Sequence, residues 1–136
     1  MARRKLLVID DEAAITSLIE RIAEPCGYDV VATSDAGEFQ ESFEAAPPDV
    51  ICLDLAMPHV DGIEILRFLA DRQCSCPLLI VSGFDGGTVS TALRLAEARG
   101  LNVAGAIPKP IKIEELRDLL SSLAGDGSAL GRSARL

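Results

Sequence analysis

The chain has 136 residues, of which 49% are hydrophobic and 25% charged, the size and composition of one soluble globular domain. This length argues against a two-domain enzyme with its own substrate lobe, and every apolar run is too short to span a bilayer. The 21 acidic residues outnumber the 13 basic ones and give a formal net charge of -8, which disfavours direct binding of DNA or RNA.

Short apolar runs alternate along the chain with amphipathic helical patterns. We predict strands at residues 6–9, 28–32, 50–53, 78–81 and 103–107. The first, third and fourth are apolar throughout, as expected for strands covered on both faces of a parallel sheet, whereas Asp29 indicates that the second is an edge strand. Between the runs, apolar residues recur at helical spacing in five groups: Ile15, Leu18, Ile19 and Ile22; Phe39 and Phe43; Ile63, Leu66 and Leu69; Val89, Leu93 and Ala96; Ile113, Leu116, Leu120 and Leu123.

Five strands alternating with five helices predict a single α/β domain, a doubly wound three-layer sandwich around a mostly parallel sheet. Residues that commonly end helices agree with this pattern, because Gly27 and Gly100 each follow a helical stretch. We expect the domain to cover residues 1–124. Residues 125–136, which are rich in Gly and Ser, are expected to form a flexible tail or the start of a linker.

The four cysteines are interpreted as reduced thiols. Cys52 lies inside an apolar run and reads as a small buried hydrophobe, and Cys26 has no neighbours that would complete a metal site. Cys74 and Cys76 are close in sequence, but the chain offers few further Cys or His ligands for zinc. The basic N-terminus meets acidic residues before a signal-peptide core can form, so we expect a cytoplasmic location.

Polar residues follow four of the predicted strands. Asp10 and Asp11 follow the first strand, Asp54 the third, Ser82 the fourth and Lys109 the fifth. The carboxyl ends of parallel strands meet at one edge of the sheet, where open α/β folds bind their ligands. Two carboxylates about 4 Å apart repel by roughly 4 kcal/mol at an effective dielectric constant of 20. Such a cluster therefore needs a cation, or a proton on one member.

This set of residues predicts phosphoryl transfer to a carboxylate. Oxygen ligands without His or Cys favour Mg²⁺, and Lys109 and Ser82 suit phosphoryl oxygens. Structural alternatives exist for each residue alone: Asp10 and Asp11 as a helix N-cap, Asp54 as a loop residue, Lys109 as part of a turn. Their joint occurrence at one edge favours a site.

At these positions the sequence resembles the receiver domains of two-component response regulators, over about residues 5–124. The matching segments are Val8-Ile9-Asp10-Asp11-Glu12, Asp54 with Met57-Pro58, Asp61-Gly62, Ser82-Gly83 and Lys109-Pro110. The resemblance implies a flavodoxin-like sheet of strand order 2-1-3-4-5. It also implies that Asp54 accepts a phosphoryl group from a sensor histidine kinase or a histidine phosphotransfer protein in a phosphorelay.

The same resemblance implies a role for each site residue. Asp11 and Asp54 would ligate Mg²⁺ together with the backbone carbonyl of Ala56, and Asp10 would act largely through water. Lys109 would pair with the phosphoryl group, and Ser82 would supply the hydroxyl that turns toward it. The chain would then be a signalling module rather than an enzyme, acting on an output domain or effector, or on a second copy through the fourth helix, fifth strand and fifth helix.

The sequence departs from the family pattern at Ala106, where receivers often carry Tyr or Phe, and Phe84 is the nearest substitute. We therefore expect the signal to travel through Ser82, the Phe84 loop and the fourth helix, which Gly86-Gly87 opens. Two further segments resemble receivers that accompany EAL cyclic-di-GMP phosphodiesterase domains: Arg99-Gly100-Leu101-Asn102-Val103 and Ala106-Ile107-Pro108-Lys109-Pro110.

Other functional classes fit the sequence less well. A phosphatase of the haloacid dehalogenase type would carry the motif Asp-x-Asp at its nucleophile. In this chain Ala56 stands where the second aspartate would act as acid or base. A pseudo-receiver would lack some of the acidic, lysine and hydroxyl positions, and a nucleotide-binding flavodoxin-like module would have a glycine-rich loop after the first strand. His59, the only histidine, is interpreted as an exposed loop residue, and no Gly-x-Ser-x-Gly motif indicates a hydrolase.

Overall fold

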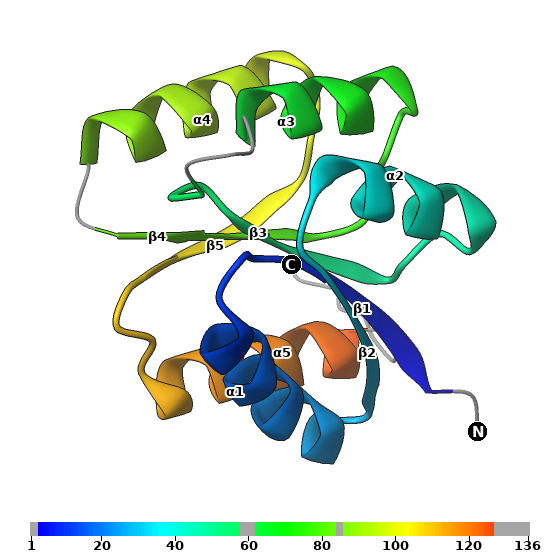
Figure 1. Ribbon diagram of the computed structural model, residues 1–136, viewed down its shortest axis with the longest axis vertical. Coiled ribbons are helices and arrows are strands. Elements are labelled where there is room, and N and C mark those ends of the chain that lie inside the picture. Colours follow the sequence, from blue (N-terminus) through cyan, green and yellow to red (C-terminus); the bar gives the residue numbers. More distant parts are fainter. Residues whose placement is uncertain (1–2, 58–61, 84–85, 127–136) are drawn as a thin grey trace.

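A computed structural model describes residues 3–57, 62–83 and 86–126 (Figure 1). One parallel sheet has the order β2-β1-β3-β4-β5, and its strands are β1 (Arg4–Ile9), β2 (Tyr28–Thr33), β3 (Val50–Asp54), β4 (Leu78–Ser82) and β5 (Val103–Pro108). The helices are α1 (Ala13–Ala23), the short 3-10 helix η1 (Glu24–Cys26), α2 (Ala36–Ala45), α3 (Gly62–Asp71), α4 (Gly86–Ala98) and α5 (Ile113–Asp126). Helices α1 and α5 cover one face of the sheet, and α2, α3 and α4 cover the other. The predicted three-layer α/β sandwich and its strand order are confirmed.

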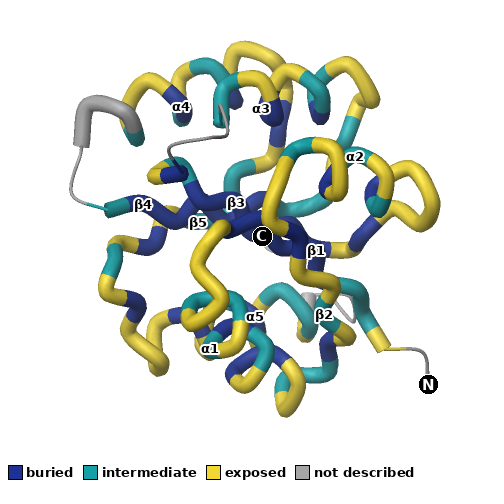
Figure 2. Tube along the Cα trace, in the orientation of Figure 1, coloured by how far each residue is buried: buried dark blue, intermediate teal, exposed yellow. Residues whose placement is uncertain are grey.

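Burial follows the predicted distinction between central and edge strands. All residues of β3 and β4 are buried, as are the last four of β1, whereas the edge strands β2 and β5 each leave residues exposed (Figure 2). Because side chains alternate along a strand, β1 contributes Leu7 and Ile9 to the core beneath α2, α3 and α4, and Leu6 and Val8 to the core beneath α1 and α5. Helices therefore pack against both faces of the sheet, and this packing holds the ends of its strands in place.

The helices differ from the predicted apolar stripes at two places. In α3 the fully buried residue of the first turn is Ile65, and Ile63 is only partly buried at the rim. Ile113 is 52% exposed, because it is the first residue of α5 and lies beside a groove between α1 and α5 rather than over the sheet. Helix α5 also continues to Asp126, two residues past the expected domain end at 124, and residues 127–136 lie outside the described part of the chain.

Two glycines stand where the backbone turns left-handed after a helix. Gly27 follows η1 with φ +98°, and Gly100 follows α4 with φ +79°. Glycine adopts such angles without the steric penalty that a Cβ atom brings. These positions confirm the helix ends that the sequence predicts. Within the described residues, no helix combines the length and the apolar character that crossing a membrane requires.

A buried hydrogen bond of Tyr28 connects the beginning of β2 to α5. Its side chain is fully buried, and its hydroxyl donates a 2.8 Å hydrogen bond to the backbone carbonyl of Leu120. We expect Tyr28→Phe to lower the free energy of unfolding by about 1–2 kcal/mol, because the Leu120 carbonyl then loses its buried donor. Urea denaturation of both proteins at neutral pH measures this difference.

The same residue predicts a pH dependence. Burial raises the pKa of Tyr28 from 10.0 to about 12, so above pH 10.0 the unfolded chain releases a proton that the folded chain retains. This contribution to stability is complete below pH 10.0 and is lost as the pH rises through about 12. The stability advantage of wild type over Tyr28→Phe should therefore shrink across this interval, and a constant difference would contradict the assignment.

Candidate functional site

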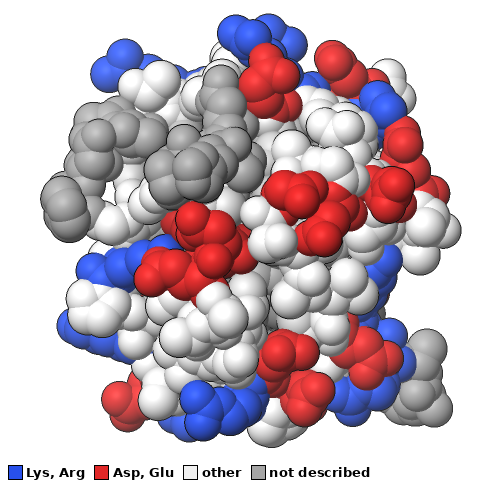
Figure 3. Space-filling model, in the orientation of Figure 1, with Lys and Arg blue, Asp and Glu red and all other residues white. Residues whose placement is uncertain are grey.

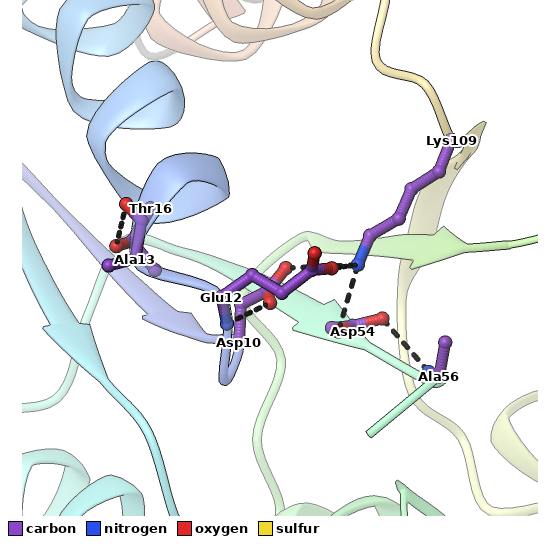
Figure 4. A network of polar contacts seen from close by, with 7 residues as sticks. All are labelled: Asp10, Glu12, Ala13, Thr16, Asp54, Ala56 and Lys109. Carbon is purple, nitrogen blue, oxygen red and sulfur yellow. Dashed lines mark hydrogen bonds and ion pairs between the residues drawn. The ribbon is translucent and has the colours of Figure 1, made fainter. Parts of the chain in front are cut away.

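The carboxyl ends of β1, β3, β4 and β5 bring the predicted site residues to one edge of the sheet. Strands β1 and β3 are hydrogen-bonded neighbours, so Asp10 and Asp54 lie close together. The Nζ atom of Lys109 is 3.1 Å from Oδ2 of Asp54 and 3.4 Å from Oδ2 of Asp10 (Figure 4). One carboxylate oxygen from each of Asp10, Asp11, Glu12 and Asp54 lies within 4.8 Å of the others. Acidic side chains also gather near the middle of the face in Figure 3.

Asp10 is held by the turn that leads from β1 into α1. Its backbone N–H donates to the carbonyl of Thr33 at 3.1 Å, and its Oδ1 accepts the backbone N–H of Glu12 at 2.9 Å. The N-cap of α1 is Glu12, whose side chain makes no capping hydrogen bond. Glu12, rather than Asp10 or Asp11, therefore stands at the N-cap position of α1. Asp11 is exposed at the rim of the cluster.

Asp54 is the last residue of β3 and is only 2% exposed. Its Oδ1 accepts the backbone N–H of Ala56 at 2.9 Å, which leaves Oδ2 directed at Lys109. The chain after it is anchored by a 2.9 Å hydrogen bond from Leu55 N–H to the carbonyl of Val81. Gly62 fits this turn because a Cβ atom there would lie 2.6 Å from the Leu55 side chain. A residue without a Cβ atom therefore suits the start of α3.

Lys109 provides the positive charge of the cluster. Its backbone N–H donates to the carbonyl of Ser82 at 2.7 Å, and the Lys109–Pro110 peptide bond is cis. Burial works against the ammonium form, but hydrogen bonds to Glu12 and Asp54 and the negative charges of Asp54 and Asp10 outweigh it and raise the pKa of Lys109. The side chain is therefore a fixed cation beside Asp54.

Asp10 is the carboxylate of the cluster whose pKa is raised. Burial, reinforced by the charge of Asp54, raises the pKa of Asp10 from 3.8 to about 6. Among the described residues its Oδ2 is buried and has no hydrogen-bond partner, although it forms a 3.4 Å ion pair with Nζ of Lys109. A buried acceptor oxygen among further carboxylates, with no nitrogen or sulfur ligand in the group, matches the oxygen donors that a hard divalent cation such as Mg²⁺ prefers.

Glu12 is a member of the site that the sequence did not single out. Its Oε1 accepts a 3.0 Å hydrogen bond from Nζ of Lys109, although the side chain is 60% exposed. The only signal in the sequence is its place after Asp10 and Asp11, where it equally suits the start of a helix. Its contact with Lys109 depends on the fold of residues almost one hundred positions apart.

The Glu12–Lys109 pair should contribute little to stability. An ion pair with one largely exposed partner gains little net free energy, so we expect Glu12→Gln to change the free energy of unfolding by less than about 1 kcal/mol. Denaturation with urea in metal-free buffer measures it. A loss of several kcal/mol would mean that Glu12, rather than Asp54 and Asp10, is the principal partner of Lys109.

Ser82 ends β4 and borders a small hollow. The serine is 7% exposed, and a cavity of about 130 Å³ lies beside it. The cavity is lined by Ser82, Gly83, Val89, Ala106, Ile107 and Pro108. The small side chain of Ala106 leaves room where a larger residue would fill the space. His59, Asp61 and Phe84 lie outside the described residues, as does Pro58.

Comparison with protein families gives a match over almost the whole described chain. The family described as response regulator receiver domain matches residues 6–121. Among solved structures, a response regulator from Colwellia psychrerythraea superposes with a TM-score of 0.74 at 32% identity, over 90% of this chain and 97% of that one. A response regulator receiver domain protein from Clostridium thermocellum gives a TM-score of 0.73 at 25% identity, over 92% and 97% of the two chains.

Curated relatives are longer proteins. The transcriptional regulatory protein TrcR of Mycobacterium tuberculosis is 33% identical over 96% of this chain and 49% of its own length. Response regulator MprA of Mycolicibacterium vanbaalenii is 34% identical over 97% of this chain and 56% of its own length. The chain thus spans about half the length of these two relatives, so the similarity concerns one domain of each.

Proposed function

Because this chain belongs to the response regulator receiver domain family, we propose that it accepts a phosphoryl group on Asp54 and thereby switches a signalling surface. The donor we propose is a phosphohistidine on a sensor histidine kinase or a histidine phosphotransfer protein. The observation that carries the proposal is the position of Lys109, whose Nζ lies 3.1 Å from a carboxylate oxygen of Asp54 at the acidic edge of the sheet. A buried nucleophile beside a fixed cation suits attack on a phosphoryl group.

In the proposed reaction an oxygen of Asp54 attacks the phosphorus atom of the phosphohistidine. The new O–P bond makes an acyl phosphate, and the N–P bond breaks with its electron pair returning to the imidazole of the donor. Lys109 offsets the negative charge of the phosphoryl oxygens, and the Ser82 hydroxyl donates a hydrogen bond to one of them. Hydrolysis of the acyl phosphate returns the domain to its starting state.

We also propose that Mg²⁺ supports this reaction. Asp11, Asp54 and the backbone carbonyl of Ala56 would hold the ion, with Asp10 acting largely through water. The ion would reduce repulsion between the carboxylates and the incoming phosphoryl oxygens. The fit rests on the all-oxygen donor set and on the buried Oδ2 of Asp10, which no described residue satisfies with a hydrogen bond.

Incubation with acetyl phosphate and Mg²⁺ tests the proposal on the whole chain. Intact-mass measurement should show one added phosphate per chain, and hydroxylamine should remove it, because acyl phosphates react with this nucleophile. Incubation without Mg²⁺ is the control and should give little product. A chain that stays unmodified, or a phosphate that resists hydroxylamine, would refute acceptance on an aspartate.

The output is proposed to run through Ser82 and α4. The small side chain of Ala106 cannot act as an aromatic switch, and the hollow beside Ser82 borders Val89 of α4. We therefore expect that the phosphoryl mimic beryllofluoride changes hydrogen exchange chiefly in residues 82–100, where an output domain, an effector or a second copy would read the change. Changes confined to α1 and α3, with α4 silent, would contradict this route.

The resemblance to receivers that accompany EAL domains, the cytoplasmic location and the boundary at 124 stay predictions.

A further inference from the structure

Two cysteines face each other in the loop between α3 and β4. The Sγ atoms of Cys74 and Cys76 are 3.1 Å apart, and both residues are only partly buried. The loop lies at the amino end of β4, at the opposite end of that strand from Ser82 and the acidic edge (Figure 1). The pair is thus close enough for chemistry between its two sulfur atoms, and it takes no part in the site described above.

The backbone holds both cysteines in place. At the end of α3, Gln73 adopts φ +55°, its N–H donates to Ala70 O at 3.0 Å, and the N–H of Cys74 donates to Leu69 O at 3.0 Å. These two bonds form a Schellman motif, which fixes the first cysteine. On the other side, the carbonyl of Pro77 accepts the N–H of Ile51 at 3.0 Å. Because Ser75 is the only residue between the cysteines, the Cα atoms are no more than about 7 Å apart, near the range that a disulfide requires.

The surroundings of Cys74 differ from those of the other cysteines. The hydrogen bond from Cys76 lowers the pKa of Cys74 to about 7, against the opposing effect of partial burial. A thiolate is the nucleophilic form of cysteine. Cys52 is fully buried, and burial raises its pKa to about 12. Cys26 contacts the Ile22 carbonyl and the Ser121 hydroxyl, each at 3.4 Å. Among the described residues, the acidic cluster is the only group of metal-ligand type, so the cysteine pair lacks further ligands for zinc.

We propose that Cys74 and Cys76 form a site of reversible oxidation, in which a low-molecular-weight disulfide such as glutathione disulfide converts the two thiols into a disulfide within the loop. The Cys74 thiolate attacks one sulfur of the oxidant, so that a mixed disulfide forms and one glutathione thiolate leaves. Cys76, on losing its proton, attacks the Cys74 sulfur and expels the second. The cysteines lose two electrons and two protons, and glutathione disulfide becomes two glutathione thiols.

Oxidation should leave phosphorylation possible. Strand β4 lies between the pair and Ser82, and its four residue steps from Leu78 to Ser82 cover about 13 Å at the rise of a parallel strand. Within the strand Leu78 pairs with Ile51, and Val81 pairs with Asp54, so the sheet between the two sites is buried and regular. The oxidised protein should therefore still take up phosphate from acetyl phosphate, which makes the test independent of the proposed receiver function.

The experiment oxidises the intact chain with glutathione disulfide, blocks the remaining thiols with iodoacetamide and digests with trypsin. Cleavage after Arg72 and Arg94 releases residues 73–94, which contain Cys74 and Cys76 and no other cysteine. Cys26 and Cys52 are both carried by residues 22–67. We expect the first peptide to escape alkylation and to lack the mass of two hydrogen atoms, and dithiothreitol treatment before blocking should restore both alkylation sites.

Single variants distinguish the two cysteines. Cys76→Ser should accumulate a mixed disulfide between glutathione and Cys74, because the second thiol is missing, whereas Cys74→Ser should react more slowly. Cys26→Ser is the matched control and should oxidise like wild type. Circular dichroism of each variant checks folding. A reduced 73–94 peptide in wild type, alongside a modified 22–67 peptide, would overturn the proposal, and so would equal reaction of Cys74→Ser and Cys76→Ser.

Discussion

Asp54→Asn should abolish uptake of phosphate from acetyl phosphate, because asparagine has no carboxylate oxygen to attack phosphorus. The substitution keeps the size of the side chain and an oxygen that accepts the Ala56 N–H. It also removes a negative charge beside Asp10 and a charged partner of Lys109, two changes with opposite effects on stability, so folding of the variant is measured directly. Intact mass in the presence of Mg²⁺ measures the uptake, and a thermal melt measures folding.

Asp71→Asn is the matched control for this experiment. Asp71 is an exposed residue at the end of α3, so its variant should be phosphorylated like wild type. Equal uptake by Asp54→Asn and wild type would mean that another residue accepts the phosphate. Peptide mapping would then identify that residue, and the assignment of Asp54 would be wrong.

Asp10→Asn should stabilise the metal-free protein at neutral pH. In wild type the pKa of Asp10 is raised from 3.8 to about 6, mainly by burial and then by the charge of Asp54. Stability from this group is therefore complete below pH 3.8 and is lost as the pH rises through about 6. The neutral amide avoids that loss, and we expect a gain on the order of 2–3 kcal/mol above about pH 6, vanishing toward pH 3.8. Urea denaturation in the presence of a chelator measures the gain.

Asp11→Asn provides the comparison, because Asp11 is exposed where Asp10 is buried. We expect its metal-free stability to stay near that of wild type, while the stabilisation that Mg²⁺ brings is largely lost. In Asp10→Asn the response to Mg²⁺ should be weakened less. The two variants thus separate the repulsion inside the cluster from direct ligation of the ion. An Asp11→Asn protein stabilised by Mg²⁺ as strongly as wild type would contradict the proposed ligand set.

Most of the fold could be predicted from the sequence, because each central strand contains an uninterrupted apolar run. β3 and β4 are buried on both faces, and only their last residues, Asp54 and Ser82, are polar. A polar residue at the end of such a run marks both the end of the strand and its place at the edge of the sheet. The grouping of the acidic residues with Lys109 could therefore be predicted from strand ends alone.

Other features depend on packing that periodicity does not contain. Ile113 fits the apolar stripe of α5, but the helix begins beside the α1 groove and leaves this residue 52% exposed. The contact of Glu12 with Lys109 depends on the orientation of two side chains from opposite ends of the chain. The Cys74–Cys76 pair comes directly after a left-handed turn at Gln73, a residue type that does not signal φ +55°.

The hydrogen bond from Lys109 N–H to the carbonyl of Ser82 has a consequence for motion in this part of the sheet. It ties the main chain of Ser82 to the residue that carries the cation, at an N–O distance of 2.7 Å. Because this bond holds the carbonyl, we expect the Ser82 hydroxyl to change rotamer without moving the end of β4, and we expect any displacement of the chain toward α4 to begin at Gly83. Gly83 is open on the side of the described residues, since a Cβ atom there would meet none of their atoms within 4 Å. We therefore expect the backbone of Ser82 to stay in place while the chain rotates about Gly83.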